Sequence, residues 1–287
     1  MNTMNTIRVA LGAALLAGAL GVQSVNAQTT EGAATAAPTT TAPTAESVMK
    51  QAHMNLFYPA DDGRAVVHME LTDKRGKSRS RDFIMLRLDV EDGGEQKYYT
   101  WFTGPSDVKR TSFMVWKDPV KDDSRWIYIP ALDLVKRISA NDKASSFVGS
   151  DFSYEDVSGR HWSDDVHTLV REEEQAGDMA WVVESTPKEK DSFAKKITWV
   201  SKEKMLPLRE EYFNDKGELE RVFTAEGFVD VDGIISVTKR TMTNEKKNHK
   251  TVVEFSEISY DVGIEDDIFT ERYLKAPPKA LLEGEGS

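Results

Sequence analysis

The sequence predicts a mainly β protein, built on one large, twisted antiparallel sheet that curls to leave a concave face. Three observations support this fold class. Apolar and polar side chains alternate along most of the chain, short turns rich in Gly, Asp and Asn separate the alternating runs, and long helical patterns occur only near the two ends. Because parallel strands need long crossover connections, strands joined by such short turns are expected to pair antiparallel.

Residues 1–27 have the features of a secretory signal peptide. Arg8 precedes a run of small and apolar residues (9–22), and residues 25–27 (Val-Asn-Ala) place small side chains where a signal peptidase cleaves. The apolar run is shorter than the ~20 residues that a membrane-spanning helix needs. We therefore expect a protein exported to the periplasm.

The mature chain is predicted to hold one folded domain between two loose ends. Residues 28–45 consist mainly of Ala, Thr and Pro and predict a disordered linker, and residues 276–287 predict a flexible tail. No low-complexity segment interrupts residues 46–275, so these are expected to form a single β domain.

Composition excludes several classes of function. The net charge of −11 makes nucleic acid and anionic membrane surfaces poor partners. Cysteine is absent, so the chain has no disulfide, no thiolate nucleophile and no cysteine that could carry a lipid.

The first folded element is predicted to be a helix over residues 46–57. Thr44 can cap it, Glu46 suits its first turn, and apolar side chains recur every four residues at Val48, Ala52 and Leu56. A final short helix is expected at 265–274, where two aspartates suit an N-terminus.

Between the helices the period changes to two, and about twelve strands are expected. The predicted strands are 65–71, 83–90, 96–103, 112–117, 125–129, 134–139, 179–186, 193–200, 207–213, 219–229, 234–242 and 250–260. A curled sheet of this size must fill its concave face with side chains, with a helix or with a ligand. Two short helices are too few to fill it, so a partly empty apolar groove is expected.

Aromatic residues are concentrated in the first third of the predicted strands. Alternation places Tyr99 and Trp101 on one face and Tyr98 and Phe102 on the other, so the sheet should be apolar on both faces there. One face would lie under a helix and the other would meet something else, although such aromatics also serve as ordinary core. The candidates for the groove lining are Trp101, Phe113, Trp126, Tyr128, Leu86, Leu88 and Trp199.

The sequence gives no specific reason to propose catalysis, a metal or a cofactor. His161 and His167 lie near each other, but their spacing matches no metal site. The segment 149–156 holds three carboxylates, which more often cap a short helix, with Ser150 or Asp151 as the N-cap. An envelope hydrolase using Asp151, Glu155 or Asp156 is an alternative, although nucleophile-elbow and phosphate-loop motifs are missing.

The order of segments resembles the LolA-like outer-membrane lipoprotein-sorting family, in the branch associated with RND-type transporters. The resemblance covers residues 46–275 and is carried by residues 102–118, by 124–157 with its GSDFSYED block, by 183–188, by 199–219 and by the ending FTERYLK (269–275). It implies an open, incomplete β-barrel with helices over its mouth, a hydrophobic cavity, and no cofactor. The mature chain is longer than the small carriers of this family, and their cavity residues cannot be transferred to it.

The resemblance and the curled sheet together predict a periplasmic carrier, or chaperone, that shelters a lipid or lipoprotein acyl chain. Its lid would be the helix at 46–57, and each buried methylene would contribute about 0.8 kcal/mol. The alternative is a sensor or adaptor that docks an RND-type transporter without carrying cargo. Transfer of labelled lipid between vesicles distinguishes the two hypotheses.

Overall fold

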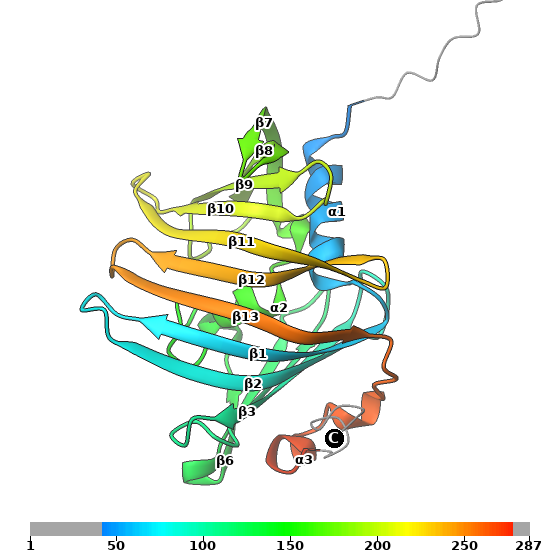
Figure 1. The fold of residues 1–287 in the computed structure, drawn as a ribbon, viewed down its shortest axis with the longest axis vertical. Coiled ribbons are helices and arrows are strands. Elements are labelled where there is room, and N and C mark those ends of the chain that lie inside the picture. Colours follow the sequence, from blue (N-terminus) through cyan, green and yellow to red (C-terminus); the bar gives the residue numbers. More distant parts are fainter. Residues whose placement is uncertain (1–41, 278–287) are drawn as a thin grey trace, which may run out of the picture. The chain divides into compact units, whose positions relative to one another are not determined.

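The computed structural model describes residues 42–277, which contain thirteen strands in one antiparallel sheet (Figure 1). The strands are β1 (Asp62–Thr72), β2 (Ser78–Asp89), β3 (Gln96–Gly104), β4 (Ser112–Lys117), β5 (Ser124–Ile129), β6 (Leu134–Ile138), β7 (Asp165–Gln175), β8 (Asp178–Pro187), β9 (Lys195–Ser201), β10 (Pro207–Phe213), β11 (Leu219–Val231), β12 (Ile234–Asn244) and β13 (His249–Tyr260). The helices are α1 (Ala45–Phe57), α2 (Tyr154–Ser158) and α3 (Glu271–Lys275), with 3₁₀ turns η1 (Pro130–Leu132), η2 (Ala140–Asp142), η3 (Trp162–Asp164) and η4 (Asp266–Ile268).

The sheet consists of two meanders joined in the middle. Strands β1 to β6 form one meander and β7 to β13 the other, and β1 pairs with β13 to give the order β6-β5-β4-β3-β2-β1-β13-β12-β11-β10-β9-β8-β7. The edge strands β6 and β7 do not pair with each other. The predicted antiparallel, open and incomplete barrel is therefore confirmed.

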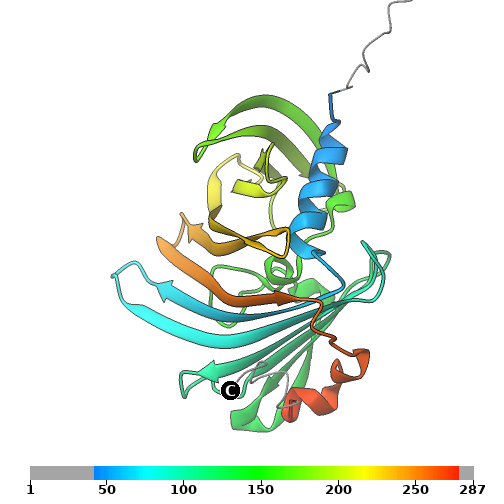
Figure 2. The same ribbon diagram turned by 45° about the vertical axis from the view of Figure 1, so that its right-hand side comes forward.

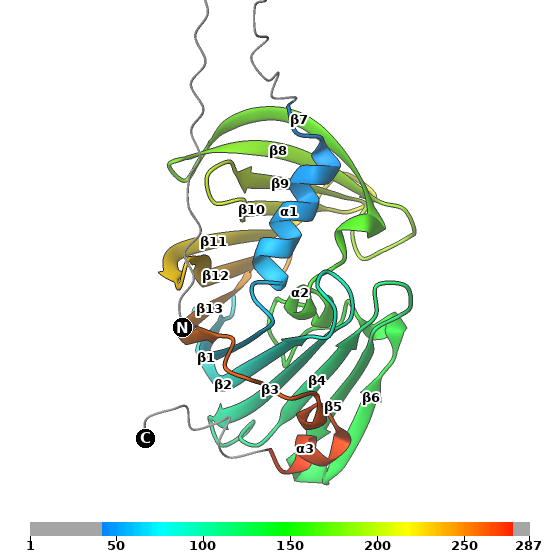
Figure 3. The ribbon, with the colours of Figure 1, turned by 90° about the vertical axis from the view of Figure 1, so that its right-hand side faces the viewer.

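The connection between the two meanders runs through the concave side of the sheet. Residues 139–164, which we call the plug, contain η2, α2 and η3. Figure 2 shows α2 inside the curve of the sheet, with α1 across its open side and α3 against its outer side. Figure 3 looks onto α1, which crosses the β7–β9 end of the sheet.

Helix α1 forms where the sequence predicts it. The Thr44 hydroxyl accepts a hydrogen bond from the Ser47 N–H at 3.1 Å, which caps the helix. Its buried face, with Val48, Met49 and Ala52, packs on Val183 and Val200 of the sheet. None of the helices in residues 42–277 combines the length and the apolar character that crossing a membrane requires.

Two predicted elements need correction. The sequence pattern misses β7, because this edge strand carries Arg171 and three successive glutamates and has no continuous apolar face. The helix predicted at 265–274 is divided into η4 and α3. Each of the twelve predicted strands overlaps an observed one. The predicted signal peptide (1–27) and most of the linker and tail lie outside the described residues, so the domain boundaries stay predictions.

The outer face of the β2–β5 region is covered by residues 262–275, which we call the C-terminal strap. The Asp62 carboxylate accepts hydrogen bonds from the N–H groups of Val262, Gly263 and Ile264 at 2.8–2.9 Å, which turns the chain away from β13. Apolar side chains of the strap then pack on the sheet, and the cluster consists of Ile264, Ile268, Phe269 and Leu274 with Ile84, Leu86, Tyr99, Met114 and Tyr128. The strap closes this face with the protein's own chain.

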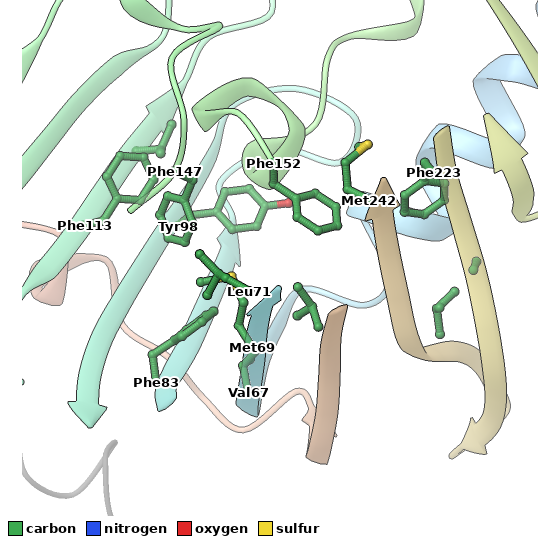
Figure 4. Close-up of a cluster of buried hydrophobic side chains, with 14 of the residues drawn as sticks. Val67, Met69, Leu71, Phe83, Tyr98, Phe113, Phe147, Phe152, Phe223 and Met242 are labelled. Atoms are coloured by element: carbon green, nitrogen blue, oxygen red, sulfur yellow. The ribbon is translucent and has the colours of Figure 1, made fainter. Parts of the chain in front are cut away.

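The inner face holds the largest cluster of buried apolar residues. Figure 4 shows this cluster, in which Tyr98 of β3 points toward Phe152 of the plug, and Phe223 and Met242 lie beyond them. The ring of Phe147 from the plug contacts that of Phe113, with centroids 5.3 Å apart. The plug thus fills part of the concavity with aromatic side chains.

Candidate functional site

The plug does not fill the concave side of the sheet completely. A cavity of about 210 Å³ remains between α1, the plug and the inner face of the sheet. Its wall is mainly apolar and includes Met49, Leu56, Ala65, Met69, Phe83, Met85, Phe152, Leu206, Phe223, Val237, Met242, Val253 and Phe255. Several of these residues belong to the inner core cluster, so the cavity is a gap within the core itself.

Helix α1 forms one side of the wall. Its N-terminal half rests on β8 and β9 through apolar contacts, whereas hydrogen bonds hold its C-terminal end. The Phe57 carbonyl accepts from the Gln96 side chain at 2.6 Å, and the Tyr58 hydroxyl donates to the Gly94 carbonyl at 3.0 Å. The contacts of the N-terminal half are therefore non-directional, whereas those at the C-terminal end are directional.

The plug is fastened to the sheet by buried polar contacts at Asp151. Its carboxylate lies 2.5 Å from Nδ1 of His249 and accepts a hydrogen bond from the Thr251 hydroxyl at 2.8 Å. The Asp151 N–H donates to the same hydroxyl at 2.9 Å. These contacts hold Phe152 in the cavity wall.

The other carboxylates of this segment are also structural. The cap of α2 is Ser153, in a capping box with Asp156, so the predicted caps Ser150 and Asp151 are wrong by two or three positions. Asp156 also accepts from Arg221 at 2.5 Å, and Glu155 pairs with Lys143 at 2.8 Å. Each of the three carboxylates named for a hydrolase is therefore held by partners within the fold.

Near α1 the cavity becomes polar. Arg160 pairs with Asp165 at 2.8 Å, and Lys196 pairs with Glu210 at 2.9 Å, which places two ion pairs in the wall. His53 of α1 is buried, and its Nε2 has no hydrogen-bond partner within the described chain.

Three histidines, His53, His161 and His167, gather at this end of the cavity. The ring centroids of His53 and His161 are 5.4 Å apart. Burial holds the pKa of all three below its usual range, and the charges of Lys117 and Lys196 further lower the pKa of His53. The neutral forms are therefore favoured beneath the helix.

Two of these histidines have hydrogen-bond partners within the fold. His161 Nδ1 lies 2.7 Å from the Ser163 hydroxyl, and His167 lies between the Ser185 hydroxyl (2.8 Å) and the Trp162 carbonyl (2.7 Å). Residues 42–277 contain no group of three or more His, Asp or Glu side chains that could hold a metal ion.

None of the seven side chains predicted to line a groove lies in the cavity wall. Five of them, on β2, β3 and β5, belong to the outer cluster beneath the C-terminal strap: Leu86, Leu88, Trp101, Trp126 and Tyr128. Trp199 lies in a small separate cluster with Ala180 and Val182. Phe113 is on the inner face, where Phe147 and Tyr154 of the plug cover it.

The sequence pattern also marked residues that line the observed cavity, but this pattern was ambiguous. Phe83, Met85 and Tyr98 alternate with the predicted Leu86 and Trp101 and therefore lie on the opposite face of the same strands. Because both faces are apolar, alternation alone could not show which face the chain's own strap would cover.

The fold is shared with several solved structures. An outer membrane lipoprotein-sorting protein domain from Vibrio parahaemolyticus is 27% identical with a TM-score of 0.75, and the match covers 80% of this chain and 98% of that one. A DUF1329 family protein from Desulfovibrio piger is 29% identical with a TM-score of 0.74, over the same shares of both chains. A LolA superfamily protein from Nitrosomonas europaea, at 20% identity and a TM-score of 0.63, covers 81% of this chain and all of its own. It shows the fold alone.

The sequence also matches a protein family. No curated protein matches the chain significantly. A family model described only as an uncharacterized protein matches residues 94–276. The resemblance to outer-membrane lipoprotein-sorting proteins is confirmed by the solved structures. The chain therefore belongs to the family of this model and has the LolA-like fold.

Proposed function

We propose that the protein is a periplasmic carrier that binds an acyl chain of a lipid or lipoprotein in the cavity and moves it between layers of the cell envelope. The observation that carries this proposal is an apolar cavity inside the core, closed on one side by a helix that rests on apolar contacts. The likeness to a lipoprotein-sorting domain supports the cargo class, and the predicted signal peptide supports the location.

Burial of the acyl chain would drive binding. Each methylene that enters the cavity contributes about 0.8 kcal/mol, so several methylenes can offset the loss of packing when α1 moves. That packing consists mainly of Val48, Met49 and Ala52 on Val183 and Val200. The hydrogen bonds at Phe57 and Tyr58 would keep the helix attached while its N-terminal half moves outward.

We infer a binding role without catalysis. The three carboxylates of the cavity wall, Asp156, Asp165 and Glu210, are each held in an ion pair with a cation. The rest of the wall is mainly apolar. Such an environment favours retention of a hydrocarbon chain over activation of water.

An RND-type transporter is the predicted partner, on the strength of the sequence resemblance alone. A carrier would deliver its cargo to such a partner or receive cargo from it. A sensor or adaptor would bind the transporter and the lipid without net transfer, and the experiment below separates these two roles.

The test is transfer of fluorescent phospholipid from donor to acceptor vesicles by the mature protein. Ala65 lines the cavity from β1, so Ala65→Trp should fill the space and reduce transfer at least about tenfold, because the lost burial exceeds 1.4 kcal/mol. The matched control is Ala131→Trp in the exposed turn η1, which should leave transfer unchanged.

Thermal unfolding of both variants would show that the fold persists. If the wild type binds lipid but does not transfer it between vesicles, the sensor hypothesis is favoured over the carrier hypothesis. Equal transfer by wild type and Ala65→Trp would contradict the cavity as the binding site.

A further inference from the structure

The cavity wall is positively charged although the chain as a whole is acidic. Net charge over the sequence is −11, yet the wall contains five cationic side chains and only three carboxylates. The cations are Arg64, Arg87, Arg160, Lys196 and Arg240, and the carboxylates are Asp156, Asp165 and Glu210. Four of the five cations have a carboxylate partner: Arg64 pairs with Glu257, Arg87 with Asp89, Arg160 with Asp165 and Lys196 with Glu210.

The excess is concentrated at Arg240 of β12. Among the arginines of residues 42–277, the buried Arg81, Arg87 and Arg125 lie 3.3, 2.5 and 2.7 Å from the carboxylates of Asp107, Asp89 and Asp123. Arg240 forms no ion pair with any carboxylate in the same part of the chain, and its Nε has no hydrogen-bond partner there. A half-buried guanidinium, whose Nε is fully buried, is thus left without a carboxylate counter-charge in residues 42–277.

The surroundings of Arg240 are aromatic and apolar. Its guanidinium lies over the Phe255 ring at 4.8 Å from the centroid, and Phe255 itself lines the cavity. Burial lowers the pKa of Arg240, and the groups that oppose this effect are the hydroxyls of Tyr98 and Tyr260 and not a carboxylate. An arginine remains protonated under these conditions, so the wall holds a positive charge that no carboxylate of residues 42–277 balances.

Unpaired buried charges are unfavourable unless a partner supplies the opposite charge. A guanidinium offers several N–H donors arranged for a carboxylate or phosphate. Apolar side chains on both sides of Arg240 along the wall, including Val237, Met242 and Val253, would contact a hydrocarbon chain attached to such a group.

We propose that the ligand of this cavity is an anionic amphiphile, whose acyl chain lies along the apolar wall and whose carboxylate or phosphate pairs with Arg240. This inference rests on the proposed binding of an acyl chain and names its head group. A free fatty acid and a phosphate-headed lipid share the required chemistry.

The test compares three ligands with the same chain: dodecanoate, dodecyl phosphate and dodecanol, each titrated below its aggregation limit into the mature protein. The wild type should bind one or both anions about 10- to 100-fold more tightly than the alcohol. This ratio of affinities corresponds to the free energy of one charge-assisted hydrogen bond. The anion that binds more tightly identifies the source of the head group. Arg240→Met should abolish the preference and leave the affinity for dodecanol unchanged.

Two further variants keep the test decisive. Arg240→Lys retains the charge and should keep part of the preference, so it reports on the head group even if Arg240→Met folds poorly. Arg171→Met removes an exposed arginine of β7 and is the matched control, with no expected effect. Equal binding of all three ligands by the wild type would contradict the inference that Arg240 pairs with an anionic head group. A preference for anions that persists in Arg240→Met would contradict it too. Either result would leave the proposed carrier function intact. Failure of the wild type to bind any of the three would instead contradict the proposed function.

Discussion

The two faces of the sheet use similar side chains with different results. In β3, Tyr98 and Phe102 belong to the inner cluster, and Tyr99 and Trp101 to the outer one. The outer face is closed by the C-terminal strap, which is fixed by the Asp62 contacts and by hydrogen bonds such as that from the Tyr99 hydroxyl to the Tyr273 carbonyl at 2.7 Å. The inner face is only partly filled by the plug, and a cavity remains.

We propose that this difference gives the two faces different tasks. A face covered by its own chain contributes stability, whereas a face with unfilled volume loses packing contacts that a ligand can restore. Large aromatic side chains are therefore a poor guide to the binding face of such a sheet. The role of these aromatic side chains depends on whether another segment of the chain covers them completely or leaves a cavity beside them.

The largest change in stability is expected when the packing of the C-terminal strap on the outer face is disrupted. Phe269 of the strap is almost fully buried, and Phe269→Ala should lower the free energy of unfolding by about 3–5 kcal/mol because of the cavity that it leaves. Lipid binding should not change, because Phe269 is remote from the cavity wall. Denaturant unfolding and lipid titration would measure the two effects, and loss of both would contradict the separation of the faces.

The plug joins stability to binding, because it covers the inner face and also lines the cavity. Asp151→Ala removes the acceptor for Thr251 and the partner of His249, and should lower stability by about 2–4 kcal/mol. The same change should alter lipid affinity, since Phe152 would lose its anchor. A variant that is destabilised but binds lipid with unchanged affinity would show that the plug serves only as core.

Acidification should weaken the polar end of the inner face. The pKa of His53 is held well below its usual range by burial and by the nearby Lys117, His161 and Lys196. As pH falls below about 6.5, His53 becomes protonated in the unfolded chain but stays neutral in the folded one. Protonation of this one group therefore lowers the free energy of unfolding by up to about 1.4 kcal/mol per pH unit.

His53→Gln should reduce this slope, and the effect would be measured as the free energy of unfolding at pH 7.5 and pH 5.5. His161 and His167 have pKa values displaced in the same direction and would retain their share of the slope. An identical pH dependence in wild type and variant would contradict the role of His53.

The smallest expected effect is at the cap of α2. Ser153→Ala removes the hydroxyl that accepts from the Asp156 N–H at 3.0 Å, and should lower stability by about 1 kcal/mol. Thermal unfolding would detect this change. Because the Asp156–Arg221 pair remains, lipid binding should stay close to that of the wild type, and a large loss of binding would show that the plug is less firmly held than its contacts indicate.

The fold could be predicted from the sequence, because alternation and turns are local signals. Helix α1, twelve of the strands and the antiparallel order follow from residues that lie close together in the chain. Strand β7 could not be predicted, since its pairing with β8 compensates for a mainly charged sequence.

The presence of a cavity could be predicted from the sequence, but the residues of its wall could not. The number of strands predicts a hollow, and α1 lies over it as expected. Which face is hollow depends on long-range contacts: the strap covers Trp101 and Trp126 only because Asp62 turns the chain after β13. The unpaired charge of Arg240 could not be predicted either, because no local pattern reveals that a charged side chain lacks an ion-pair partner within residues 42–277.

The most direct measurement is mass spectrometry of lipids extracted from the mature protein, purified gently without detergent, for wild type, Ala65→Trp and Phe269→Ala. We expect acyl lipid in amounts close to one ligand per protein in the wild type and in Phe269→Ala, and little or none in Ala65→Trp. Wild-type protein without lipid, or undiminished lipid in Ala65→Trp, would contradict the cavity on the inner face as the place where cargo is carried.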